Sequence, residues 1–185
     1  MDLAIHDSSL ETPRLVLEPI MPHHAHVVYE NLTEPKLYQF IPQNPPSSLQ
    51  ELETRYRSLA LRKSPDEQEL WLNWAGRLRK TQIYIGVFQA TVHADLCAEI
   101  AYTVFLQFWR QGYGREGLHG VLNYLFNTYE VTSVAAEIDT RNLASVRLVK
   151  SLGFQCESVT KNADFFKGSY SDEYRYKINR FDLLP

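Results

Sequence analysis

The sequence predicts one α+β domain, over residues 1–185, built on a mixed and mostly antiparallel sheet. Three observations support this prediction. Segments rich in β-branched and aromatic residues follow one another through short polar turns between residues 70 and 105, as antiparallel neighbours do. A strand–helix–strand pattern then forms a βαβ unit, and the last segments form a C-terminal hairpin. A chain of 185 residues with 44% hydrophobic side chains is long enough to bury one core.

The first third of the chain is expected to hold one strand and two helices. Leucines alternate with other residues at 14–19, which predicts the strand. The prolines of PQNPP at 42–46 force extended backbone and separate two segments with helical spacing. Those segments are marked by Ala25, Val28, Tyr29 and Leu32 and by Leu49, Leu52, Tyr56 and Leu59. Ser48 is expected to cap the second helix, while the Glu51 carboxylate returns to the N–H of Ser48.

The remaining elements follow in order. Strands are predicted at 70–78, 83–92, 96–105 and 133–138, and hairpin strands at 154–166 and 170–178 with a turn at 167–169. Apolar side chains at helical spacing predict two helices, marked by Leu118, Val121, Leu122, Leu125 and Phe126 and by Ala144, Leu148, Val149 and Leu152. Gly153 is expected to end the second of them.

Composition excludes several classes of function. The 19 basic and 22 acidic residues give a net charge of −3, which is too mild and too mixed for binding nucleic acid or an anionic membrane. No apolar run approaches the roughly 20 residues of a membrane span, and the start lacks a basic segment followed by an apolar one. We therefore expect a cytoplasmic protein. Cys97 and Cys156 lie far apart and are expected to be small packed side chains, without a disulfide or zinc.

The segment FWRQGYGREG at 108–117 lies between a strand and an amphipathic helix. Its glycines let backbone N–H groups converge and the helix start adds partial positive charge, so the turn suits a phosphate or pyrophosphate. The alternative is a glycine-rich connector that binds nothing. Gly112, Gly114 and Gly117 also satisfy GxGxxG, with Glu137 or Asp139 about 20 residues later, as in dinucleotide-binding domains. Antiparallel strands before the turn and a short chain after it argue against a dinucleotide-binding domain.

Four segments together resemble the GNAT superfamily of acetyl-CoA-dependent N-acetyltransferases. They are TPRLVLEPI at 12–20, AEIAYTVF at 98–105, WRQGYGREG at 109–117 and NLASVRLVKSLGF at 142–154, in the family's order. Trp109 replaces the usual Gln or Arg, as in the branch related to ribosomal-protein N-terminal (alanine/serine) acetyltransferases. The resemblance implies a three-layer α/β/α fold, with helices on both faces of a twisted sheet. It also implies that the strands at 96–105 and 133–138 are parallel neighbours that splay apart.

The resemblance further implies where acetyl-CoA binds. Its pyrophosphate would lie on backbone N–H groups of the turn, and its pantetheine arm would enter the gap between the splayed strands, where a ligand amide can satisfy an unpaired edge. The implied contacts are Thr103, Val104, Phe105, Arg110, Gln111, Gly112, Tyr113, Gly114, Arg115 and Asn142. No metal is expected, because His23, His24 and His26 point in different directions at a helix start.

Acetyl transfer from a thioester to an amine needs a proton acceptor and protonation of the departing thiolate. Glu99 is the candidate base, acting directly or through a water, and the alternative is an ordinary surface glutamate. Ser145 is the second candidate catalytic residue, although Asn142 and Ser145 equally fit a helix cap. Val149 replaces the tyrosine that many members use as general acid. Solvent or Ser145 is therefore expected to serve a thiol with a pKa near ~8.5.

The expected acceptor is a primary amine that attacks directly in a ternary complex: a protein or peptide N-terminal α-amine, or a small-molecule amine. An α-amino group with a pKa of about 8 is easier to deprotonate than a lysine near ~10.4. The acceptor groove is expected to be lined by Tyr38, Phe40, Trp71, Trp74, Tyr84, Phe165, Tyr170 and Asp172, although such aromatic residues also fit a plain core. The protein is expected to be a monomer or homodimer. The alternatives are a catalytically silent acyl-CoA-binding module and, more remotely, an NAD-binding protein.

Overall fold

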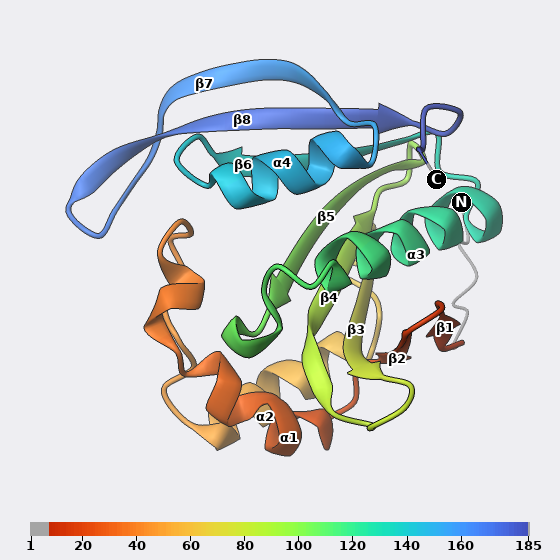
Figure 1. The fold of residues 1–185 in the computed structure, drawn as a ribbon, viewed down its shortest axis with the longest axis vertical. Coiled ribbons are helices and arrows are strands. Elements are labelled where there is room, and N and C mark those ends of the chain that lie inside the picture. Colours follow the sequence, from red (N-terminus) through yellow and green to blue (C-terminus); the bar gives the residue numbers. More distant parts are fainter. Residues whose placement is uncertain (1–7, 185) are drawn as a thin grey trace.

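The computed structural model describes residues 8–184, which fold around one eight-stranded sheet in the order β1-β2-β3-β4-β5-β6-β8-β7. Neighbouring strands are antiparallel except for β5 and β6. Helices α3 and α4 cover one face of the sheet and α1 and α2 the other (Figure 1). The predicted α+β fold with a mixed, mostly antiparallel sheet is confirmed. The sheet is not the doubly wound parallel sheet that an NAD-binding domain needs, so that alternative is excluded.

Every predicted strand is present to within one residue at each end, and all four predicted helices form. The strands are β1 (Leu10–Glu11), β2 (Leu15–Pro19), β3 (Leu70–Leu78), β4 (Tyr84–Val92), β5 (Cys97–Val104), β6 (Ser133–Asp139), β7 (Gln155–Phe166) and β8 (Ser169–Asn179). The helices are α1 (His24–Leu32), α2 (Leu49–Leu59), α3 (Tyr113–Thr128) and α4 (Leu143–Ser151). Strand β1 and the short 3₁₀ helices η1 (Pro35–Tyr38) and η2 (Leu106–Phe108) were not predicted.

Two local predictions were wrong in part. The Ser48 hydroxyl caps α2 by accepting from the Glu51 N–H at 3.1 Å, as expected. The Glu51 carboxylate, however, accepts from the N–H and hydroxyl of Ser47, because that residue offers two donors one position earlier. Cys156 is exposed rather than packed, since it lies on the outermost strand β7.

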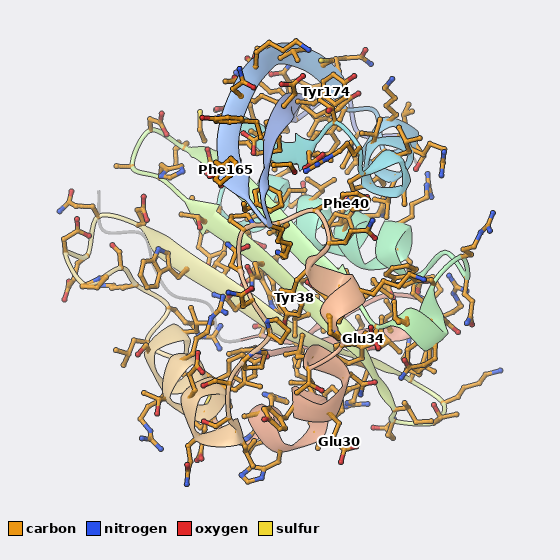
Figure 2. All side chains as sticks on the ribbon, turned by 90° about the vertical axis from the view of Figure 1, so that its left-hand side faces the viewer. Glu30, Glu34, Tyr38, Phe40, Phe165 and Tyr174 are labelled. Atoms are coloured by element: carbon orange, nitrogen blue, oxygen red, sulfur yellow. The ribbon has the colours of Figure 1, made fainter. Side chains whose placement is uncertain are left out.

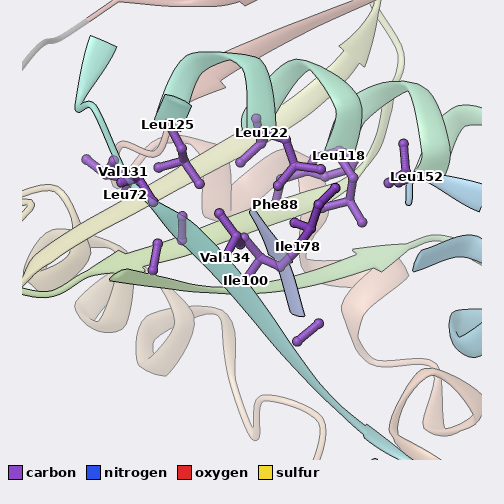
Figure 3. Close-up of a cluster of buried hydrophobic side chains, with 14 of the residues drawn as sticks. Leu72, Phe88, Ile100, Leu118, Leu122, Leu125, Val131, Val134, Leu152 and Ile178 are labelled. Atoms are coloured by element: carbon purple, nitrogen blue, oxygen red, sulfur yellow. The ribbon is translucent and has the colours of Figure 1, made fainter. Parts of the chain in front are cut away.

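Hydrophobic side chains fill both faces of the sheet. The larger cluster lies between the sheet and the helices α3 and α4, where Leu118, Leu122 and Leu125 meet Phe88 and Ile178 (Figure 3). A smaller cluster lies under α1 and α2. Burial on both faces fixes the positions of all four helices against the strands. Within residues 8–184, the structure contains no helix with the length and apolarity that a bilayer crossing requires.

The two parallel strands separate soon after they meet. β5 and β6 pair only at Cys97↔Ser133, Ala98↔Val134 and Glu99↔Ala135. Beyond these pairs β5 continues alongside β4 as far as Val104, and β6 continues alongside β8 as far as Asp139. Figure 1 shows the two strands diverging. The expected splay is therefore confirmed, and it leaves one edge of β5 without a strand partner.

Candidate active site

The turn between β5 and α3 presents backbone donors at a helix start. Arg110 and Gly112 have φ angles of +59° and +81°, and α3 begins directly after Gly112, whose place at the cap offers no side-chain acceptor. The first N–H groups of a helix have no partner within that helix, and its N-terminus carries partial positive charge. The N–H groups of Tyr113 and Gly114 are thus arranged to receive a phosphate.

The three glycines of this segment have different roles. Gly112 supplies the left-handed backbone of the turn. A β-carbon on Gly114 would lie 2.9 Å from Cδ1 of Leu148 on α4, and one on Gly117 would overlap the ring of Phe88 on β4. Gly117 therefore allows α3 to pack closely on the sheet. The GxGxxG spacing thus combines a turn with helix packing and does not indicate a dinucleotide.

Sequence reasoning missed the clamp that ties this turn to the start of β2. The Glu116 carboxylate accepts from Thr12 Oγ1 at 2.6 Å, from Arg14 N at 2.7 Å and from Arg14 Nε at 2.5 Å. Arg14 Nη1 also donates to the carbonyl of Gln111 at 3.0 Å, and its guanidinium lies 4.4 Å from the centre of the Tyr113 ring. The two segments lie about 100 residues apart in the sequence, so the sheet order brings them together.

Removing the clamp should destabilise the fold. We expect Glu116→Ala to lower the free energy of unfolding by about 2 kcal/mol, because hydrogen bonds to a charged group are worth ~1.5–3 kcal/mol and Thr12 and Arg14 lose a common acceptor. Urea unfolding measures this loss. Glu53→Ala is the control, because its exposed pair with Arg57 at 3.7 Å should contribute less than ~0.5 kcal/mol. Equal losses in the two variants would contradict a specific role for the clamp.

The clamp also predicts sensitivity to acid. Burial favours a higher pKa for Glu116, but hydrogen bonds from Thr12 and Arg14 outweigh it and hold the pKa below its ordinary value of 4.5. A carboxyl with a lowered folded pKa stabilises the protein fully above the unfolded pKa and loses this contribution as pH falls through the folded pKa. Between pH 7 and pH 3, Glu116→Ala should therefore lose less stability than the unmodified protein. Parallel losses in urea titrations would contradict this.

Backbone direction decides which β5 groups face the gap. Phe105 N–H donates to Ile85 of the β4 side at 2.8 Å, and Cys97 C=O accepts from His93 N–H at 2.9 Å. Backbone N–H and C=O groups alternate in direction along a strand. Those of the odd-numbered residues of β5 therefore point toward β4, and those of the even-numbered residues point toward the gap. Leu96 C=O agrees, since it accepts from Thr132 N–H next to β6 at 2.8 Å.

This parity corrects the implied coenzyme contacts at Thr103 and Phe105, whose backbone groups face β4. The Phe105 carbonyl is also engaged by Phe108 N–H at 2.9 Å. Of the implied residues on this strand, Val104 faces the gap, and its carbonyl accepts from Trp109 Nε1 at 2.6 Å. Tyr102, which sequence reasoning missed, also directs its backbone groups into the gap. The alternation along a strand can be read from the sequence, but the hydrogen bonds to Ile85 and Thr132 were needed to show that the even-numbered residues face the gap.

The start of α4 combines a cap with a candidate site residue. Asn142 Oδ1 accepts from Ser145 N–H at 3.2 Å, which confirms the capping interpretation of this pair. Val149 is fully buried in the main core, and its hydrocarbon side chain offers no polar group. The roles of Asn142 and Ser145 toward a coenzyme stay predictions.

Glu99 lies where β5 and β6 separate, directly opposite Ala135. Its side chain is 46% exposed, and its Oε1 lies 3.2 Å from Arg175 Nη1 on β8. Arg175 also contacts Glu137 at 2.7 Å and Glu157 at 3.2 Å. A guanidinium shared by three carboxylates thus holds Glu99 at the vertex of the gap. Its role as a base stays a prediction.

A cavity of about 500 Å³ opens beside Glu99, on the α1 and α2 side of the sheet. Its lining contains the carboxylates of Glu51, Glu99, Glu137, Asp164 and Glu173 against the single guanidinium of Arg55. Burial raises the pKa of Glu173, and repulsion from Glu137, Asp164 and Asp139 raises it further. Across the cavity mouth, Lys167 Nζ in the hairpin turn donates to the carbonyls of Ile41 and Gln43, at 2.6 Å and 3.2 Å. The cavity is therefore suited to a positively charged ligand.

Most residues expected in the acceptor groove lie outside this lining. Tyr38 does line the cavity, and its hydroxyl donates to Leu32 C=O at 2.9 Å. Trp74 is 1% exposed in the main core, because its position on β3 faces α3. Tyr84 donates to Glu18 at 2.7 Å near the far end of β4. The expectations for Trp74 and Tyr84 are therefore corrected.

The remaining members of that set are peripheral. Trp71 faces the same side as Glu99 but lies two strands away and donates to Glu69 at 3.0 Å. Phe165 and Tyr170 stack edge to face with ring centres 5.0 Å apart, exposed on the hairpin, and Asp172 pairs with Lys161 at 2.6 Å. Figure 2 shows Phe165 on the hairpin and Tyr38 and Phe40 on the segment that faces it. Phe40, like these others, lies outside the cavity lining.

Comparison with known proteins gives consistent results. The family model described as acetyltransferase (GNAT) domain matches residues 14–155. The uncharacterized N-acetyltransferase YoaA of Bacillus subtilis is 26% identical over 171 residues, which are 91% of this chain and 95% of that protein. A GNAT-family acetyltransferase from Bacillus anthracis superposes with a TM-score of 0.80 at 17% identity, over 94% of this chain and 99% of its own. Spermidine N-acetyltransferase from Vibrio cholerae, solved with CoA and spermine, superposes with a TM-score of 0.79 at 18% identity, over 91% of this chain and 96% of its own.

Proposed function

This chain belongs to the GNAT acetyltransferase family, and from that premise we propose that it transfers the acetyl group of acetyl-CoA to a primary amine in a ternary complex. The observation that carries the proposal is the junction at Glu99. There the gap between β5 and β6, which opens beside the donor-rich turn before α3, meets the acidic cavity. Acetyl-CoA would supply a thioester, so that attack by a neutral amine yields an amide, a CoA thiolate and a proton.

One set of residues binds acetyl-CoA, and another takes the proton of the acceptor amine. The N–H groups at the start of α3 bind the pyrophosphate, with Arg110, Gln111 and Arg115 around them. The N–H of Val104 and the backbone of Tyr102 offer hydrogen bonds to amides of the pantetheine arm. Glu99 accepts the proton of the attacking amine, directly or through a water. Ser145, at the cap of α4 and next to the Tyr102 hydroxyl, contributes a second hydroxyl.

The acidic cavity narrows the class of acceptor. Five carboxylates line the cavity, and they outnumber Arg55 in the lining and Arg175, which pairs with Glu99 and Glu137. This excess of negative charge favours an amine that carries a further positive charge. The N-terminal α-amine of a basic protein or peptide fits this description, and Trp109 supports the branch related to ribosomal-protein N-terminal acetyltransferases. A polyamine also fits, and spermidine is the substrate named for the Vibrio cholerae enzyme.

An amine panel tests the proposal. Free thiol released from acetyl-CoA is measured with peptides whose first residues are basic, matched peptides whose first residues are acidic, spermidine and a neutral monoamine. We expect release only when an amine is present, and about tenfold higher kcat/KM for the cationic acceptors, which corresponds to about 1.4 kcal/mol. Added salt should shrink that preference, because it screens the carboxylates. Binding of acetyl-CoA without turnover across the panel would instead identify a silent acyl-CoA-binding module.

A further inference from the structure

One buried side-chain oxygen has no hydrogen-bond partner within residues 8–184: the hydroxyl of Tyr102. Tyr102 lies on β5, three residues after Glu99, where that strand has already separated from β6. Burying a hydroxyl without a hydrogen-bond partner lowers the stability of the fold. Such a cost persists where the group serves a ligand that is not part of the chain.

Tyr102 lies on the strand that borders the gap between β5 and β6, and its hydroxyl is buried on the α3 and α4 side of the sheet. Its ring belongs to the packing under α3 and α4, and Cε2 lies 4.0 Å from where a β-carbon on Gly114 would stand. Burial raises the pKa of Tyr102 to about 12, while the neighbouring hydroxyl of Ser145 acts to lower it. No hydrogen bond of normal length and angle joins the two hydroxyls. Tyr102 therefore keeps its proton at neutral pH and has an unused donor between β5, α3 and α4.

We propose that Tyr102 donates a hydrogen bond to the sulfur that leaves acetyl-CoA. The inference rests on the proposed function. It assigns to a tyrosine on β5 a role that Val149, which has no polar group, cannot perform. When the C–S bond of the tetrahedral adduct breaks, its electron pair moves to sulfur, and the Tyr102 O–H stabilises the thiolate. The phenol retains its proton, because a thiol with a pKa near ~8.5 is the stronger acid. The thiolate receives a proton later from solvent.

The variant Tyr102→Phe separates this role from a structural one. Removing an unpaired hydroxyl should leave the free energy of unfolding unchanged or raise it. The same variant should lower kcat by about 10- to 100-fold with KM for acetyl-CoA unchanged, since the donor acts on charge that develops late in the reaction. If the hydroxyl merely filled space, Tyr102→Phe would leave kcat unchanged. Tyr124→Phe is the matched control, because its ring packs against Trp74 in the core, with centres 6.0 Å apart, and its kcat should not change.

A binding measurement provides a readout apart from activity. Calorimetry compares the affinity for CoA with that for desulfo-CoA, which lacks the sulfur, as the pH is raised through ~8.5. The unmodified protein should increasingly prefer CoA as the thiolate forms, whereas Tyr102→Phe should lose about tenfold of that preference.

The outcomes separate the two proposals. Equal kcat in Tyr102→Phe and the unmodified protein, an unchanged preference for CoA over desulfo-CoA, or a variant that fails to fold would each overturn the role of Tyr102 while acetyl transfer stands. Failure of the unmodified protein to turn over any amine or to bind CoA would overturn the proposed function itself.

Discussion

Glu99→Gln is expected to lower kcat/KM for the amine by about 10²- to 10⁴-fold, the range over which a positioned acid–base group contributes. Glu99 lies at the vertex of the gap and in the lining of the acidic cavity, so its carboxylate can reach an amine that approaches from that side. Glutamine keeps the shape of the side chain but cannot accept a proton. Affinity for acetyl-CoA should be unchanged, because the turn before α3 supplies most of that binding. Steady-state kinetics and calorimetry measure the two quantities.

The control for this variant is Glu157→Gln. Glu157 contacts the same guanidinium of Arg175, at 3.2 Å, but lies outside the cavity lining. Each substitution therefore removes one carboxylate from Arg175, and only Glu99→Gln removes the proposed base. We expect Glu157→Gln to retain kcat/KM to within about twofold, since exposed ion pairs contribute little. Equal losses in the two variants would assign the effect to the charge network around Arg175.

The dependence on pH distinguishes proton transfer from substrate positioning. An α-amine has a pKa of about 8, so above that pH it binds already neutral and the base has to take only the proton released as the amide forms. The deficit of Glu99→Gln should therefore shrink as the pH rises past this value. A deficit of constant size across the pH range would show that Glu99 positions the acceptor and does not take its proton.

The strands and helices could be predicted because each has a periodic apolar face. The alternation of side chains between the two faces of a strand gave further information about which residues can line one site. Trp71 and Trp74 are three residues apart on one strand and so must face opposite sides of the sheet, which already shows that they cannot line one groove. Which backbone groups of β5 face the gap also alternates along the strand, but only the pairing with β4 shows that these are Tyr102 and Val104 and not Thr103.

Contacts between distant segments could not be predicted in this way. The clamp from Arg14 to Glu116 depends on the order of strands in the sheet, which a single sequence does not fix. The acidic cavity draws its carboxylates from α2, β5, β6 and the hairpin, and each of them alone has the pattern of an ordinary surface glutamate or aspartate. Their common function becomes visible only when the sheet places them together.

Gly117→Ala is expected to lower the free energy of unfolding by about 2 kcal/mol. A β-carbon at this position would lie well inside 3.0 Å of the Phe88 ring, which is fully buried and cannot move aside freely. Overpacking of this kind costs typically 1–3 kcal/mol, occasionally more, and outweighs the gain of up to ~1 kcal/mol that alanine brings to a helix interior. Displacement of α3 would also move the turn at Gly112, so affinity for acetyl-CoA should fall as well. Urea unfolding and calorimetry measure both effects.

Gly120→Ala on the same helix is the matched control. A β-carbon there would meet one atom, the methyl group of the clamp residue Thr12, at 2.9 Å, so the loss of stability should be clearly smaller than at Gly117, where a whole ring is in the way. Phe88→Leu in the Gly117→Ala background completes a double-mutant cycle. Because the smaller side chain makes room for the added carbon, the double variant should be more stable than the sum of the single effects by about 1 kcal/mol or more. Strict additivity would mean that α3 is not held against β4 at Gly117, and the position of the phosphate-binding turn would then need another cause.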